Sequence, residues 1–140
     1  MVSAKRFMHR RLLLRKPEQK LSQALFKLAA DELWSLATTW PCVVEANYLL
    51  DPPQRYAMLR WVAAGAISVF AFAQESVDPM VELMRRFYRP DTEPPRSAMD
   101  FVEASLAWLA TDTGVNRIMT RNERDFSRYR LSDGRSCEIL

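Results

Sequence analysis

The chain has 140 residues, of which 49% are hydrophobic and 26% charged, with 3 Gly, 8 Pro and a net charge of +3. This composition excludes a disordered or fibrous chain and predicts a single globular domain over 1–140. The only cysteines and histidine are Cys42, Cys137 and His9, so a zinc site is excluded and a disulfide framework is not expected. No apolar run in the sequence reaches the roughly 18 residues of a membrane span, so we expect a cytoplasmic protein with no membrane partner.

Positive charge is concentrated at the N-terminus. Residues 1–20 contain seven basic side chains and one acid, Glu18, which sum to +6, whereas the remaining residues carry 13 basic and 16 acidic side chains and sum to −3. The segment 1–16 is therefore an atypical basic extension of the domain. Such an arm can bind phosphate groups, and a solvated leader or a transit peptide are the alternatives.

Helices and strands alternate along the predicted chain. Apolar residues recur at helical or strand spacing, and Pro and Gly mark the ends of these runs. The tryptophans and most of the phenylalanines follow these periods and are expected in the core. Helices are expected over 17–33, 41–50, 54–64, 76–87 and 98–113, strands over 36–40, 67–72 and 117–120, a polar loop over 121–126, and two edge-strand fragments over 129–140.

This alternation predicts an α/β fold with helices on both faces of a mostly parallel sheet. Ligands in such folds bind beyond the carboxyl ends of the strands. Four acids lie near those positions: Glu45, Asp100, Glu103 and Asp125. Each one alone is explained as a solvated or helix-capping acid. Together, without a His or Cys cluster, they suit Mg²⁺ or Mn²⁺ and the cleavage of a phosphodiester by a metal-activated water.

Three runs of sequence resemble motifs of PIN domains, in the branch of VapC-type toxins. These runs are 38–50, 99–106 and 118–126, and the most specific pattern is Thr-x-Asn-x-x-Asp-Phe in the third. The resemblance extends from Thr38 to Leu140, roughly three quarters of the chain. It implies a three-layer α/β/α sandwich on a mostly parallel central sheet. It also implies a Mg²⁺- or Mn²⁺-dependent endoribonuclease of toxin–antitoxin type with an RNA substrate. The face of Met80, Met84 and Phe87 is a candidate contact for a small antitoxin protein, with core packing or a homodimer contact as the alternatives.

The same resemblance assigns roles to individual residues. It implies that Glu45, Asp100 and Asp125 hold the metal and carry catalysis, with Glu103 as an accessory acid. Thr120 and Asn122 would shape the pocket as polar groups. Three basic residues are weaker candidates for guiding RNA, with a solvated basic face as the alternative: Arg85, Arg86 and Arg121.

The chain departs from the family at its first motif, where PIN domains end the first strand in a metal-binding Asp. Extending the comparison backward from Pro17 puts Ala4 in that position, and no acid precedes Glu18. A hard-ion site with one carboxylate fewer binds its metal more weakly. Three explanations stay open: a catalytically degenerate PIN-like module that acts through protein or RNA binding, an altered N-terminus, or a site rebuilt around Glu103.

Overall fold

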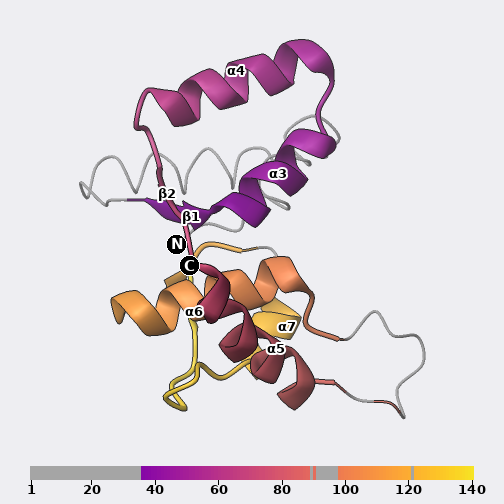
Figure 1. Cartoon of the computed structure of the whole chain (residues 1–140), viewed down its shortest axis with the longest axis vertical. Coiled ribbons are helices and arrows are strands. Elements are labelled where there is room, and N and C mark those ends of the chain that lie inside the picture. The colour runs from indigo at the N-terminus through magenta and orange to yellow at the C-terminus, as the bar shows by residue number, and fades with distance from the viewer. Residues whose placement is uncertain (1–35, 89, 91–97, 121) are drawn as a thin grey trace.

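The structure, a computed structural model, describes residues 36–88, 90, 98–120 and 122–140. The predicted helix over 17–33, the basic segment 1–16 and Arg121 lie outside the described residues. In chain order (Figure 1), the elements are β1 (Ala37–Thr39), α3 (Trp40–Tyr48), α4 (Pro52–Ala63), β2 (Ser68–Phe70), the 3₁₀ turn η1 (Gln74–Ser76), α5 (Val77–Arg86), α6 (Phe101–Thr113), β3 (Arg117–Ile118), α7 (Glu123–Arg128) and β4 (Glu138–Ile139).

Most predicted helices and strands in this part of the chain are confirmed, with shifted ends. Helix α6 begins three residues later than expected because Asp100 is its N-cap, with extended backbone and a side chain that accepts the N–H of Glu103. The predicted polar loop over 121–126 is wrong, since 123–128 forms α7. Acids in its first turn and Arg128 in its last suit the helix dipole, and buried Phe126 anchors the helix to the core.

The described strands form two separate two-stranded sheets. Strand β1 pairs in parallel with β2, and β3 pairs in parallel with β4. An antiparallel bridge between Arg130 and Ser136 closes the turn before β4. The α/β class with parallel strands is therefore confirmed, whereas these residues do not show the single central sheet of a three-layer sandwich.

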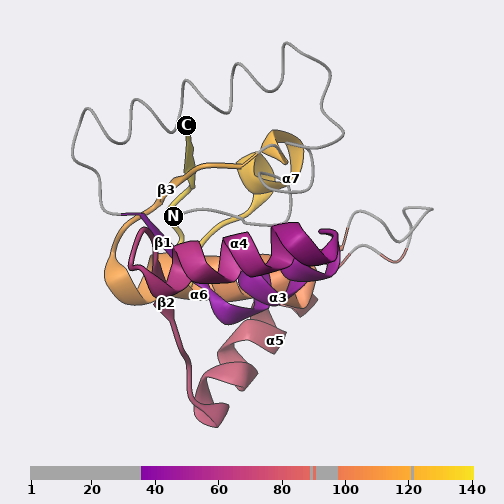
Figure 2. The same ribbon diagram turned by 90° about the horizontal axis from the view of Figure 1, so that it is seen from above.

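Helix α6 is the centre of the core. Its fully buried apolar residues pack against α5 on one side and against β1 and α3 on the other, and Figure 1 shows α6 between these elements. Helix α5 contributes Met80 and Leu83, as its apolar spacing predicts. The view from above in Figure 2 shows α4 lying across α3, on the outside of the fold.

The expectation that the aromatic residues fill the core is wrong for four of them. Trp40, Trp61, Phe70 and Phe101 all keep more than a third of their surface exposed. On α3 the exposed residues are Trp40 (47%), Val44 (65%) and Tyr48 (80%), which lie four residues apart and form one apolar stripe. Helical spacing shows that these residues share a face, but the opposite face of α3 is the one that packs inward.

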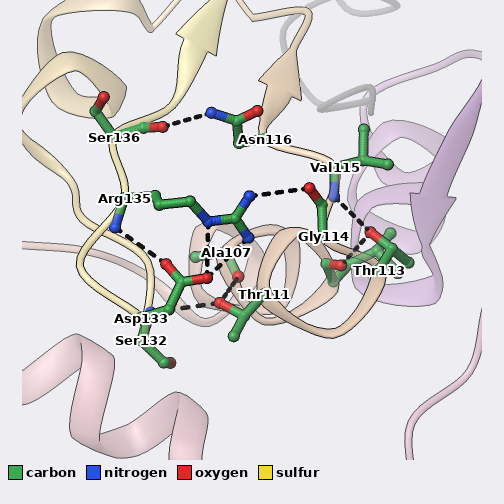
Figure 3. Close-up of polar contacts among 11 residues, drawn as sticks. Ala107, Thr111, Thr113, Gly114, Val115, Asn116, Ser132, Asp133, Arg135 and Ser136 are labelled. Carbon is green, nitrogen blue, oxygen red and sulfur yellow. Dashed lines mark hydrogen bonds and ion pairs between the residues drawn. The ribbon is translucent and has the colours of Figure 1, made fainter.

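The turn before β4 is attached to the C-terminal end of α6 (Figure 3). Arg135 donates through Nε to the Asp133 carboxylate at 2.8 Å and through a terminal nitrogen to the Gly114 carbonyl oxygen at 3.0 Å. The Asn116 amide donates to the Ser136 carbonyl oxygen at 2.9 Å. A guanidinium at a helix C-terminus also interacts favourably with the helix dipole. These contacts fix the end of α6 and the start of β3.

Replacing Gly114 by alanine is expected to lower the free energy of unfolding by about 1 to 2 kcal/mol. Gly114 ends α6 in the left-handed region with φ of 72°, and a Cβ there would meet no atom within 4 Å, so the cost arises in the backbone alone. Urea denaturation measures the effect. Gly114→Asn is the control, because asparagine tolerates this conformation and should lose less. Equal stability of Gly114→Ala and the original chain would contradict the prediction.

Candidate functional site

Asp100 and Glu103 form a reciprocal cap at the start of α6. The Asp100 Oδ1 atom accepts the backbone N–H of Glu103 at 2.8 Å, and Glu103 Oε2 accepts the backbone N–H of Asp100 at 3.2 Å. This capping box satisfies two N–H groups that a helix end leaves without an intrahelical partner. It holds the two predicted acids together at the N-terminus of the central helix.

The Glu103 carboxylate also binds two residues that follow β3. Asn122 Nδ2 donates to Oε1 at 2.8 Å, and the Tyr129 hydroxyl donates to Oε2 at 2.9 Å. The backbone N–H of Asn122 donates to Thr120 Oγ1 at 3.1 Å, and both of these residues are buried. The structure therefore brings together four predicted site residues, Asp100, Glu103, Thr120 and Asn122, beyond the carboxyl end of β3.

Burial dominates the electrostatics of this cluster. Burial raises the pKa of Glu103, and the neighbouring Asp100 charge raises it further, while the hydrogen bonds from Tyr129, the Asp100 N–H and Asn122 oppose the shift. Burial also raises the pKa of Tyr129, with the Glu103 charge as the next cause. The Tyr129 hydroxyl is therefore a permanent hydrogen-bond donor to Glu103 at neutral pH.

The raised pKa of Glu103 predicts how stability changes with pH in metal-free buffer. The folded chain holds this proton more tightly than the unfolded chain, so the contribution is fully present below the unfolded pKa of about 4.3 and is lost as pH rises through the folded pKa. Urea denaturation across this range in the presence of EDTA should show the decline. Glu103→Gln should lack it, and the same slope in both chains would contradict the assignment to Glu103.

Asp125 lies in the first turn of α7, close to the same cluster. Its Oδ1 atom pairs with the Arg128 guanidinium at 3.2 Å, and its backbone carbonyl oxygen accepts the N–H of Tyr129 at 3.1 Å. The Asp125 charge contributes to the raised pKa of Tyr129, as the Glu103 charge does. Tyr129 therefore lies within electrostatic reach of both acids.

Glu45 is half-buried on α3, which packs against α6. Among the residues that the structure describes, no three Asp, Glu, His or Cys side chains form a group that could hold a metal ion. The convergence of Glu45, Asp100 and Asp125 on one ion thus stays a prediction.

A buried hydroxyl pair joins the start of α3 to α6. Thr39 Oγ1 and Ser105 Oγ lie 2.7 Å apart, and Ser105 Oγ also donates to the Val102 carbonyl oxygen at 2.7 Å. Both residues have no exposed surface. This pair connects the carboxyl end of β1 to a residue two positions after Glu103.

Ser105→Ala is expected to lower the free energy of unfolding by about 1 to 3 kcal/mol, because it leaves the buried Thr39 hydroxyl without one of its partners. Thr39→Val combined with Ser105→Ala should cost less than the sum of the two single changes, since the remaining hydroxyl is then removed as well. Thermal and urea unfolding of the original chain, the two single variants and the double variant measure this coupling. Strict additivity would show that the hydroxyl pair contributes nothing.

The basic end of α5 lies beside the acidic cluster. The Phe87 ring, which follows α5, packs on Tyr129 with 5.1 Å between ring centroids. Arg85 and Arg86 are exposed in the last turn of α5, and Arg85 pairs with Glu82 at 3.6 Å. Arg85 and Arg86 thus directly precede Phe87, the residue that contacts Tyr129 of the cluster. Arg121 is outside the described residues.

Tyr129 is the member of the cluster that sequence reasoning misses. It is fully buried, and its hydroxyl partner Glu103 lies 26 positions earlier in the chain. Only a weak signal was present, since Tyr129 follows Asp125 by four residues, the spacing of one helical turn.

Comparison with family models and with curated proteins finds no match to this sequence. Among the described residues, no helix is both long and apolar enough to cross a membrane.

Proposed function

We propose that this chain is a divalent-metal-dependent endoribonuclease of toxin–antitoxin type, in which the loss of the first Asp weakens metal binding. The supporting observation is the cluster in which Asp100, Asn122 and Tyr129 bind Glu103, with Asp125 attached through its backbone contact with Tyr129. It lies beyond the carboxyl end of β3 and at the start of α6, where α/β folds hold their ligands. Its oxygen donors are of the kind that Mg²⁺ and Mn²⁺ prefer.

The donor chemistry fits a hard ion, but the described residues do not complete a set of three ligands. Asp100 and Asp125 would hold the ion together with Glu45, and the bound metal would supply an activated water and stabilise charge on the phosphate. The other residues have supporting tasks. Glu103 fixes the start of α6 through its hydrogen bonds, and Arg85 and Arg86 attract the phosphate backbone of RNA.

The proposal includes an architecture and partners. A three-layer sandwich requires one central sheet, whereas the described strands form two separate two-stranded sheets. The exposed stripe of Trp40, Val44 and Tyr48 supports a protein partner, either a second copy of the chain or a small antitoxin. The chain would act on RNA in the cytoplasm.

A second candidate is a degenerate PIN-like module that binds protein or RNA without cleaving it. One observation favours it: three donors already bind the Glu103 carboxylate, namely Asn122, Tyr129 and the Asp100 N–H. An acid so fully engaged is a poor replacement for the missing first Asp. This argues against a site rebuilt around Glu103.

The two candidates are distinguished by incubating the purified chain with end-labelled RNA in Mn²⁺, in Mg²⁺ and in EDTA. The nuclease proposal expects cleavage in Mn²⁺ that EDTA abolishes. Asp112→Asn is a control for the loss of a negative charge outside the candidate site. This exposed acid lies about 18 Å further along α6 than Asp100, so the variant should cleave RNA as the original chain does. RNA binding without cleavage at any metal concentration would favour the degenerate module.

A further inference from the structure

The turn before β4 contains the one Asp-Gly pair of the sequence, Asp133–Gly134, and the sequence has no Asn-Gly pair. Both residues are exposed, so water reaches the peptide bond between them. The backbone nitrogen that follows an aspartate can attack its side chain, and glycine hinders this attack least because it has no Cβ. A Cβ built on Gly134 would meet no atom within 4 Å, so the surroundings leave room for the reaction.

Such an attack rearranges the main chain in two steps that need only water. In the first step, the Gly134 nitrogen bonds to Cγ of the protonated Asp133 carboxyl group, and the carboxyl OH leaves as water together with the amide proton. In the second step, water adds to the Asp133 main-chain carbonyl carbon, and the bond from this carbon to the Gly134 nitrogen breaks. The product is an isoaspartyl linkage, in which the main chain runs through Cγ and the former carbonyl is a free carboxylate.

Arg135 opposes the first step by binding the Asp133 carboxylate (Figure 3). The Arg135 backbone N–H donates to Oδ1 at 3.0 Å, and Nε and one terminal guanidinium nitrogen donate to Oδ2, both at 2.8 Å. Chiefly through the side-chain bonds, Arg135 lowers the pKa of Asp133, because donors to a carboxylate favour its ionised form. The protonated carboxyl group that the first step requires is therefore less populated.

The attacking nitrogen and the arginine are held in place as well. The Gly134 N–H donates to the Leu131 carbonyl oxygen at 2.9 Å, which opposes the loss of its proton. The other terminal nitrogen of Arg135 donates to the Gly114 carbonyl oxygen at 3.0 Å, so the guanidinium is attached to the end of α6. A planar guanidinium can bind these two acceptors at once, whereas a lysine ammonium offers no such fixed geometry.

We propose that Asp133 is an isomerisation site, converted to isoaspartate by attack of the Gly134 nitrogen, and that Arg135 suppresses this conversion in the folded chain. The conversion adds one carbon atom to the main chain of the turn. Two backbone bonds of 2.9 Å span this point, from the Leu131 N–H to the Arg135 carbonyl oxygen and from the Gly134 N–H to the Leu131 carbonyl oxygen. The product cannot keep both in their present geometry, so isomerisation also loosens the attachment of the turn to α6.

The test is the accumulation of isoaspartate in the purified full chain during prolonged incubation at physiological temperature and pH. Peptide chromatography separates isoaspartyl from aspartyl peptides of the same mass. Arg135→Gln should form isoaspartate about two- to fivefold faster than the original chain, the factor by which an exposed ion pair favours its charged partner. Arg117→Gln removes a comparable ion pair, with Glu138 at 3.4 Å, and should form isoaspartate at the original rate.

Gly134→Asn assigns the product to this peptide bond. Asparagine tolerates the φ of 86° at this position, and its side chain hinders the attack, so this variant should form isoaspartate more slowly than the original chain. Formation at the original rate in Gly134→Asn, or no isoaspartate in any of the chains, would overturn the assignment of the site.

Unfolding provides a comparison that needs no variant. In guanidinium chloride the original chain loses the bonds from Arg135, so it should form isoaspartate faster than the folded chain does. Circular dichroism establishes that each variant is folded during the incubation. Equal rates in the folded and unfolded original chain, or equal rates in folded Arg135→Gln and Arg117→Gln, would overturn the suppression by Arg135.

Discussion

Replacing Asp100 by asparagine is expected, under the proposed function, to reduce Mn²⁺-dependent RNA cleavage by at least about 100-fold. Outer partners of a metal already contribute about 10- to 100-fold, and a direct ligand, as Asp100 would be, contributes more. Asparagine is as good an N-cap as aspartate, so α6 should still begin at the same residue. The change removes the negative charge and leaves the cap. Initial cleavage rates of labelled RNA measure the effect.

Asp51→Asn is the matched control for this experiment. Asp51 caps α4 in the same way, accepting the Gln54 N–H at 3.1 Å, but its side chain is exposed and it is not one of the candidate ligands. The control should cleave RNA at the original rate. Full activity in Asp100→Asn would show that the metal is held elsewhere or that the chain is not the nuclease.

Glu103→Ala is expected to lower the free energy of unfolding by about 3 kcal/mol, because it leaves two buried donors without their acceptor. These donors are the Tyr129 hydroxyl and the Asn122 amide, both within hydrogen-bond distance of the carboxylate. The Asp100 N–H also loses its acceptor. Urea denaturation in EDTA measures the loss without any contribution from bound metal.

Glu103→Gln tests whether the hydrogen bonds or the side-chain volume account for this loss. Glutamine keeps an acceptor oxygen for Tyr129, so it should retain much of the stability that Glu103→Ala loses. Tyr129→Phe added to Glu103→Ala should cost little more, since the hydroxyl has then already lost its acceptor. Equal losses in the alanine and glutamine variants would contradict this account of the cluster.

Local sequence signals predicted most of the described secondary structure. Pro41 lies in the first turn of α3, and Gly65 and Gly114 follow α4 and α6 with positive φ. Such residues fix element ends through their own backbone restrictions. Helix α4, in contrast, begins at Pro52, two residues before its predicted start at 54. Helix α7 was missed because it has six residues and a mostly polar sequence, and its buried anchor Phe126 is recognised only from tertiary packing.

Tertiary contacts explain what sequence could not predict at the site. The spacing of Asp100 and Glu103 placed them one helical turn apart, and the structure shows them joined in a capping box. The hydroxyl of Tyr129 reaches Glu103 across 26 positions, a pairing that no local period encodes. In the same way, the spacing of Trp40, Val44 and Tyr48 defines a face of α3 but not whether another element covers it.

Two residues late in the chain form hydrogen bonds at the two ends of α6. Tyr129 binds Glu103 in the first turn of the helix, and Arg135 binds the carbonyl oxygen of Gly114 just beyond its last turn. Synthesis runs from the N-terminus, and domains fold as their segments emerge from the ribosome. Helix α6 is therefore synthesised before either of the residues that bind its ends, and the acidic cluster is completed only once Tyr129 has been added.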